Sequence, residues 1–203
     1  MGIPTHQDAP RTYNRMVSGR RLHLLDPSPL DIDITDLALG ISRQMRWGGQ
    51  TIGECGYNVA QHSLVVEAIL AEMVCKAPSL ELRLAAVTHD LPEGAGLADL
   101  VTPVKAVVTG YHELEERMER AVRLAVGLPA LLPPAWAVQV KKADIIAAVT
   151  EAVALAGWSE RDARELVGKG YRGKLWTGDL TPWPETVARE RFLVRYRQLG
   201  GRQ

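Results

Sequence analysis

Apolar residues recur at three- and four-residue steps along most of the chain after Asp33, which is the spacing of amphipathic helices. Glycines and prolines interrupt this pattern. It predicts five longer helices over about 33–48, 58–75, 79–89, 111–126 and 135–156. Ser159 and Asp162 resemble a capping box for a short helix, and Thr181-Pro182 opens a last, arginine-rich one. We therefore expect an all-α bundle of about five to seven helices, with the very apolar segment 135–156 at its centre.

The first thirty residues follow a different pattern. Ser18-Gly19 separates two short segments, 13–17 and 20–25, as in a small β-hairpin. The N-terminal residues 1–14 are polar and lack the apolar core of a signal peptide, and no apolar run reaches the roughly 20 residues that span a bilayer. We expect an N-terminal hairpin, a cytoplasmic location and no membrane partner.

Charge and length narrow the class of protein. The 203 residues fit a single domain over 1–203, and 46% hydrophobic residues are typical of a folded chain. Lys plus Arg and Asp plus Glu number 24 each, so the formal net charge is zero. This balance argues against a stable nucleic-acid partner but leaves free nucleotides open. Cys55 and Cys75 do not form a CxxC pair, and we expect two reduced thiols.

Two histidines and two aspartates are candidate metal ligands. His62 lies on the apolar stripe of the second helix, where a core histidine with satisfied hydrogen bonds is the alternative. Asp144 interrupts the apolar fifth helix, and its burial would require a basic side chain or a metal ion as partner. The His89-Asp90 dipeptide alone is a weak motif. Together the four residues form a set of two nitrogens and two oxygens suited to one divalent ion of Mn, Fe, Co, Zn or Mg.

Glu93 and Asp99 are the candidate acid–base groups. Glu93 follows His89 by four residues, so a continuing helical turn would bring both to one face. A divalent ion lowers the pKa of a water molecule and withdraws charge from a phosphoryl oxygen, while a nearby carboxylate takes the proton. This combination indicates metal-dependent hydrolysis of a phosphate ester.

These motifs, in this order, resemble those of the HD-domain phosphohydrolase superfamily, and in particular small single-domain bacterial and phage members that include 5′-deoxynucleotidases. The residues that carry the likeness are Arg46-Trp47-Gly48-Gly49, Tyr57-Asn58-Val59-Ala60-Gln61-His62-Ser63, His89-Asp90-Leu91-Pro92-Glu93, Thr102-Pro103-Val104-Lys105 and Ala143-Asp144, with Thr150-Glu151 after it. The likeness covers about residues 11–155 and fades after Trp158, so the helices over 159–199 receive no role from it.

The resemblance implies an HD-domain helical bundle in which His62, His89, Asp90 and Asp144 hold one divalent metal ion. It further implies that Glu93 activates or orients the attacking water. Asp99 would support the substrate or share the proton.

The same resemblance implies roles for three more residues. Arg46 would contact phosphate, and Trp47 would line a nucleoside pocket. Their alternative is a helix-terminal arginine and an apolar cap. Lys105 would meet phosphate or extend into solvent. Relatives of this kind commonly form homodimers or larger assemblies, so we expect a homo-oligomer.

Four functions remain open from the sequence. The first is a 5′-deoxynucleotidase that acts on deoxynucleoside monophosphates. The second is a triphosphohydrolase that releases triphosphate from a dNTP, with Arg43, Lys105 and Arg117 as candidate cations. A di-iron oxygenase would need two further histidines before Asp144, and only His112 lies in that interval. A non-catalytic helical binding protein would not require Glu93 beside a complete ligand set.

Overall fold

A computed structural model describes residues 12–202, so residues 1–11, with His6 and most of the polar N-terminal segment, and residue 203 lie outside the described part. The N-terminal hairpin is present: β1 (Tyr13–Arg15) pairs antiparallel with β2 (Arg21–His23). Gly19 in the turn has a φ of +91°, which glycine adopts without strain. The backbone N–H of Ser18 donates to Asp36 at 3.0 Å and ties the hairpin to the first helix.

The regular structure in the rest of the described chain is helical, which confirms the all-α prediction. The α-helices are α1 (Ile34–Arg43), α2 (Val59–Ile69), α3 (Leu80–Val87), α4 (Thr102–Lys105), α5 (Tyr111–Ala125), α6 (Pro134–Ala154), α7 (Glu160–Asp162) and α8 (Glu185–Gln198). Short 3-10 turns are η1 (Pro29–Asp31), η2 (Arg46–Gly49) and η4 (Leu91–Ala95), and π turns are η3 (Leu70–Val74) and η5 (Ala163–Val167).

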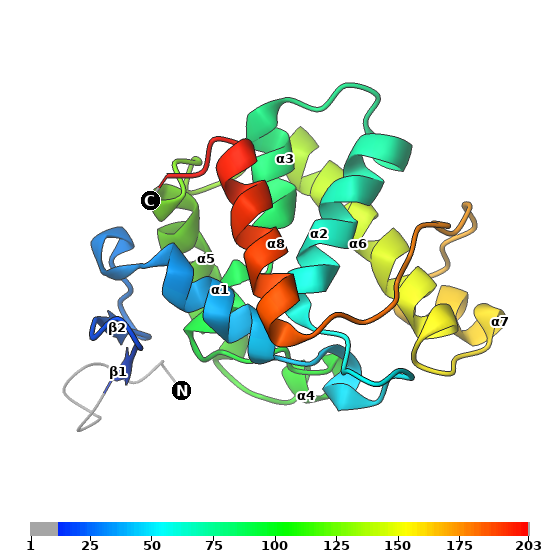
Figure 1. The fold of residues 1–203 in the computed structure, drawn as a ribbon, viewed down its shortest axis with the longest axis horizontal. Coiled ribbons are helices and arrows are strands. Elements are labelled where there is room, and N and C mark those ends of the chain that lie inside the picture. The colour runs from blue at the N-terminus through cyan, green and yellow to red at the C-terminus, as the bar shows by residue number, and fades with distance from the viewer. Residues whose placement is uncertain (1–11, 203) are drawn as a thin grey trace.

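The centre of the bundle is α2, which contacts α1, α3, α6 and α8. Figure 1 shows α8 alongside it and α6 behind it. Nearly every residue of α2 is buried. The expectation that segment 135–156 forms the centre is wrong, because α6 leaves Val138, Lys141 and Lys142 exposed on one side. One apolar cluster extends from Leu22 to Leu199 and joins the hairpin to the last helix.

Three helix ends differ from the predicted ones. The first helix ends at Arg43 rather than at Gly48-Gly49, because the next residue, Gln44, is extended with a ψ of 125°. α3 ends at Val87, so the following His-Asp pair lies in a turn. The last helix begins after Pro184 rather than at Thr181-Pro182. The segment before it is held by the side-chain amide of Gln61 on α2, which donates to the Thr181 carbonyl at 2.9 Å.

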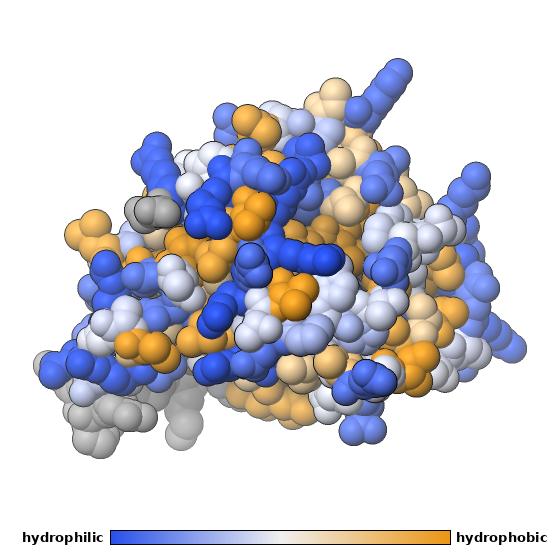
Figure 2. All heavy atoms as spheres, viewed as in Figure 1, coloured by the Kyte–Doolittle hydropathy of each residue, from blue (hydrophilic) through white to orange (hydrophobic). Residues whose placement is uncertain are grey.

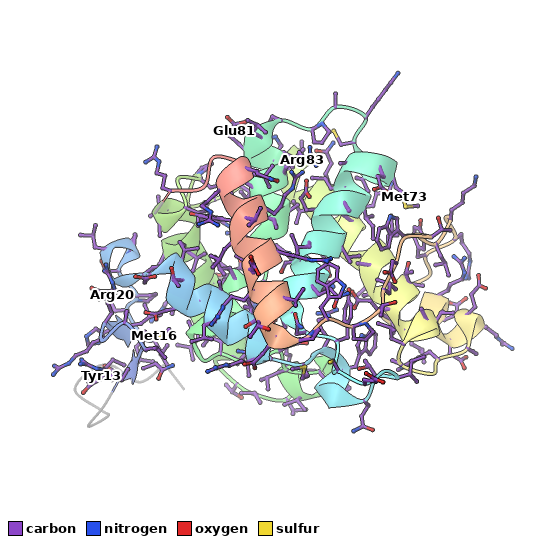
Figure 3. The ribbon with its side chains drawn as sticks, viewed as in Figure 1. Tyr13, Met16, Arg20, Met73, Glu81 and Arg83 are labelled. Carbon is purple, nitrogen blue, oxygen red and sulfur yellow. The ribbon has the colours of Figure 1, made fainter. Side chains whose placement is uncertain are left out.

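The surface on the α8 side mixes charged and apolar side chains, as Figure 2 shows. Figure 3 shows Tyr13, Met16 and Arg20 of the hairpin together at one end of the molecule. Within residues 12–202, no helix is both long enough and apolar enough to cross a membrane.

Candidate metal centre

A tight turn after α1 presents Arg46 and Trp47. Met45 forms an isolated antiparallel bridge with Asn58, which directs the chain back towards α2. Trp47 has a φ of 60° and a ψ of 23°, a left-handed conformation that costs a non-glycine residue of order 1–3 kcal/mol. Its indole N–H donates to Glu151 at 3.3 Å, and its ring packs beside Trp158 with centroids 6.3 Å apart. These contacts hold the strained turn.

His62 reaches the centre from the first turns of α2. The Asn58 side chain caps this helix by accepting the Gln61 backbone N–H at 2.9 Å. The imidazole of His62 is fully buried, and its Nδ1 lies 2.6 Å from Oε1 of Glu151. A carboxylate accepts hydrogen bonds, so Nδ1 carries the hydrogen and the lone pair of a neutral ring is on Nε2.

His89 and Asp90 lie in the turn between α3 and η4. Nδ1 of His89 is 2.9 Å from the carbonyl oxygen of Ala86. Because a carbonyl only accepts, Nδ1 again carries the hydrogen and Nε2 is left for another partner. Both imidazoles therefore present Nε2 to the same space, where their ring centroids are 5.3 Å apart.

Asp144 enters from α6 and joins the side chains that come from α2 and from the turn after α3. Its Oδ1 lies 3.3 Å from Nε2 of His62 and 3.9 Å from Nε2 of His89, while Oδ2 pairs with Lys141 at 2.7 Å. Asp90 approaches the same nitrogens at 3.4 Å and 3.2 Å. The sequence left open a basic or a metal partner for Asp144; Lys141 is the basic one.

The donor set fits a divalent metal ion. One ligand atom each from His62, His89 and Asp90 lie within 4.8 Å of one another. Within residues 12–202, neither buried Nε2 atom has a hydrogen-bond partner, although carboxylate oxygens lie close by. Buried polar atoms are nearly always satisfied, so two such atoms side by side indicate a missing partner. The His62–His89–Asp90 group could hold a metal ion.

The imidazoles and carboxylates of this cluster shift the pKa values of one another. Burial lowers the pKa of His89, but Asp90 and Asp144 outweigh it and raise that pKa to about 9. Burial and Arg46 likewise lower the pKa of His62, yet the facing carboxylates raise it well above its ordinary value. Burial alone would raise the pKa of Asp90 and Asp144, but both imidazoles hold it well below the usual range.

Glu93 and Asp99 lie beside the cluster on η4 and the loop after it. Burial, with the negative charges of Asp90 and Asp99, raises the pKa of Glu93 well above its usual range. Its Oε2 is buried and has no hydrogen-bond partner within residues 12–202. Burial also raises the pKa of Asp99. Gln44 holds both segments, because its amide donates to the Glu93 carbonyl at 2.6 Å and accepts from the Asp99 N–H at 2.8 Å.

Arg46 and Lys105 approach from different directions. The Arg46 side chain is 13% exposed, with Nε 3.2 Å from Glu151 and one terminal nitrogen 3.8 Å from both Asp90 and Asp99. Lys105 lies 3.8 Å from Glu93 but pairs more closely with Glu115, at 2.7 Å. Lys105 therefore does not simply extend into solvent, because its ammonium group lies near two carboxylates.

A cavity of about 390 Å³ opens beside the cluster between α3, α5 and α6. Its wall includes His89, Asp90, Asp144 and Lys105, together with Glu115, Glu119, Arg123, Leu128, Leu132, Val140 and Lys141. Arg46 and Trp47 lie outside this wall, on the Glu151 side of the cluster. The structure therefore brings all the predicted site residues to one region but places them on two sides of the ligand group.

Glu151 is the site residue to which the sequence analysis assigned no role. It follows Asp144 by seven residues, which is two helical turns, so both point from the same face of α6. An acidic residue at that spacing within an apolar helix was the available signal. Gln44 and Lys141 offered none, because a glutamine after a helix and a lysine on an amphipathic helix are common on surfaces.

Comparison with known proteins assigns the chain to a family, but the names of the relatives state no activity. No family model matches the chain. The uncharacterized protein RCAP_rcc00048 of Rhodobacter capsulatus is 48% identical over 162 residues, which cover 78% of this chain and 81% of that protein. The uncharacterized protein YfdR of Escherichia coli K12 is 28% identical over 140 residues, covering 69% and 70%. The chain belongs to the same protein family as the Rhodobacter capsulatus protein.

Proposed function

We propose that the protein is a metal-dependent phosphohydrolase of the HD-domain type that removes phosphate from deoxynucleoside 5′-monophosphates. One observation carries the proposal: the two buried Nε2 atoms of His62 and His89, without hydrogen-bond partners, face the carboxylates of Asp90 and Asp144. We assign these four side chains as ligands of one divalent ion of Mn, Co, Zn, Fe or Mg. When bound, the ion would polarise a phosphoryl oxygen and lower the pKa of a water molecule.

The chain's own residues supply the remaining steps. Glu93 has a buried, unpartnered Oε2, and its pKa is raised by burial and by neighbouring carboxylates. Such a carboxyl keeps its proton to a higher pH than an ordinary glutamate does, so it suits the proton transfer that accompanies attack of water on phosphorus. Arg46 is oriented by Glu151 and offers a terminal nitrogen to a phosphate oxygen. Asp99 lies 3.8 Å from that nitrogen and would help to hold it.

The pairing of nearby cations favours a monophosphate over a triphosphate. A triphosphate would need free cations beyond the first phosphate. Arg43 pairs with Glu185 at 3.4 Å, Lys105 with Glu115 at 2.7 Å, and Arg117 donates to the Leu25 carbonyl at 2.8 Å. Each of the three candidates is engaged. Triphosphate release from a dNTP remains the second candidate because it would use the same ligands.

Two other functions are less well supported. A di-iron oxygenase would need further histidines at the cluster, but His112 is 79% exposed on α5, where it pairs with Glu116. A binding protein with a structural metal would not need the unpartnered carboxyl of Glu93 beside the ligands. Self-association and a cytoplasmic location stay predictions.

The test is an assay of the purified chain after chelation, with each metal restored in turn. Deoxynucleoside monophosphates, dNTPs and generic phosphoesters form the substrate panel, and free phosphate and triphosphate are measured separately. We expect metal-dependent phosphate release that His89→Gln abolishes and that the matched surface variant His112→Gln retains. Turnover without metal, or unchanged turnover in His89→Gln, would refute the proposal. Triphosphate as the main product would favour the second candidate.

A further inference from the structure

We propose that Glu151 is a positioning residue that orients the His62 ring and the Arg46 guanidinium together. Metal binding and anion binding would then depend on one buried carboxylate. The inference rests on the metal site of the proposed function and adds to it a residue outside the ligand set.

The geometry uses both oxygens of Glu151, whose side chain is fully buried. Oε1 is 2.6 Å from Nδ1 of His62. Oε2 accepts from Nε of Arg46 at 3.2 Å and from the indole N–H of Trp47 at 3.3 Å. The carboxylate is thus surrounded by three donors that come from two separate elements, α2 and η2.

The contact with His62 determines which nitrogen can bind a metal. A neutral imidazole carries one hydrogen, and the acceptor at Nδ1 keeps that hydrogen there and leaves the lone pair on Nε2. For His89 the same task falls to a backbone carbonyl, that of Ala86. Glu151 is therefore the side chain through which the orientation of this ligand pair can be altered.

The contact with Arg46 determines where the guanidinium points. Asp90 and Asp99 lie 3.8 Å from its terminal nitrogen, which is beyond hydrogen-bond distance. Among the described residues, Glu151 is the carboxylate that accepts a hydrogen bond from Arg46. Loss of this acceptor would release the guanidinium towards the ligand carboxylates.

Glu151→Gln tests the proposal, because it keeps the shape but removes the charge and directs an amide NH₂ at one of the donors. The matched control is Glu67→Gln, since Glu67 is also a buried glutamate and pairs with Arg83 and Arg195. Figure 3 shows Arg83 on α3, towards the end where the chain enters from η3. Loss of the ion pairs of Glu67 with Arg83 and Arg195 should lower the stability of the protein without changing the proposed metal ligands.

We expect Glu151→Gln to weaken Mn²⁺ binding by about 10–100-fold in calorimetric titration. Binding of inorganic phosphate to the Mn²⁺-loaded protein should weaken by about tenfold, as expected for loss of roughly one charge-assisted hydrogen bond. Arg46→Met should weaken phosphate binding alone, and Glu67→Gln should change neither affinity. A folded Glu151→Gln variant with the Mn²⁺ affinity of the wild type would overturn the proposal.

Nitrogen-15 NMR of the wild-type imidazoles keeps the proposal testable if the variant does not fold. With Zn²⁺ bound, His62 should carry its hydrogen on Nδ1, and a hydrogen on Nε2 would overturn the inference. In the metal-free protein, the Nδ1 hydrogen should be protected from exchange by Glu151, and rapid exchange would count against the contact. A wild-type chain that binds neither ion but protects this hydrogen would refute the proposed function while supporting the Glu151 contact.

Discussion

A single methyl group added at Gly40 should disturb the packing that positions Glu93. Gly40 on α1 and Gly94 on η4 meet backbone to backbone, next to Glu93. A Cβ on Gly40 would lie 2.3 Å from the carbonyl oxygen of Gly94, and a Cβ on Gly94 would lie 2.3 Å from that of Leu37. Ordinary contact begins near 3.4 Å, so Gly40→Ala would force α1 and η4 apart by about 1 Å (3.4 minus 2.3).

Two opposing effects set the expected free energy of unfolding. Alanine is favoured over glycine within a helix by about 1 kcal/mol. Overpacking costs about 1–3 kcal/mol, and its upper range applies here because a backbone carbonyl cannot rotate away as a side chain can. We expect Gly40→Ala to lower the stability by about 1–2 kcal/mol. A displacement of about 1 Å at Glu93 is also of the size that reduces turnover by about 100-fold.

Urea denaturation of Gly40→Ala, Gly94→Ala and the double variant would measure the effect. Both substitutions open the same contact, so the double variant should lose clearly less stability than the sum of the single variants. Additive losses would mean that the two glycines act independently. A gain of about 1 kcal/mol in Gly40→Ala, as helix propensity alone requires, would refute the close approach.

Three further predictions concern metal, pH and a helix cap. Mn²⁺ at about 100 times its dissociation constant should stabilise the wild type by about 2.7 kcal/mol, whereas the stability of Asp144→Ala should not change when Mn²⁺ is added. Thermal denaturation measures both, and an equal gain in the variant would contradict the ligand assignment. In the presence of chelator, the raised pKa of His89 should contribute at most about 3 kcal/mol to the free energy of unfolding. This contribution is complete below pH 6.5 and is lost as the pH rises through about 9. Urea denaturation across this pH range measures it, and a constant stability would contradict the raised pKa. Ser159→Ala removes the acceptor of the Asp162 N–H at 3.1 Å and should cost about 1 kcal/mol in urea denaturation with an unchanged Mn²⁺ affinity; a loss of that affinity would show long-range coupling.

The periodic pattern predicted the helices that carry His62 and Asp144, whereas the His89-Asp90 pair lies in a turn just after the predicted third helix. His62, the His89-Asp90 pair and Asp144 come from three separate segments, and the structure places their side chains within contact distance. The cap of Ser159 was also predictable, because its donor lies three residues away. Both predictions depend on spacing within one helix or on the convergence that any compact bundle imposes.

Features that depend on how two elements meet could not be predicted. The turn after α1 holds Trp47 in a left-handed conformation, which its contacts with Glu151 and Trp158 make tolerable. Glu151 itself was visible as an acidic residue on the ligand face of α6. That it meets His62 depends on how α2 crosses α6, and spacing along one helix carries no information about the crossing.

Two of the proposed ligands, His62 and Asp144, are anchored on other helices than Glu93, which leads to a sharper expectation for Gly40→Ala. Asp144 and Glu151 lie on α6 about 10 Å apart along its axis, so a shift of that helix would move a ligand and the support of His62 together. Glu93 is on η4, which is held against α1 and, through its carbonyl at 2.6 Å, by Gln44. Because α1 carries none of the four proposed ligands, but Asp90 directly precedes η4, Gly40→Ala should reduce turnover in the proposed reaction more than it weakens Mn²⁺ binding. An equal loss of both would mean that η4 and the ligand group move as one body.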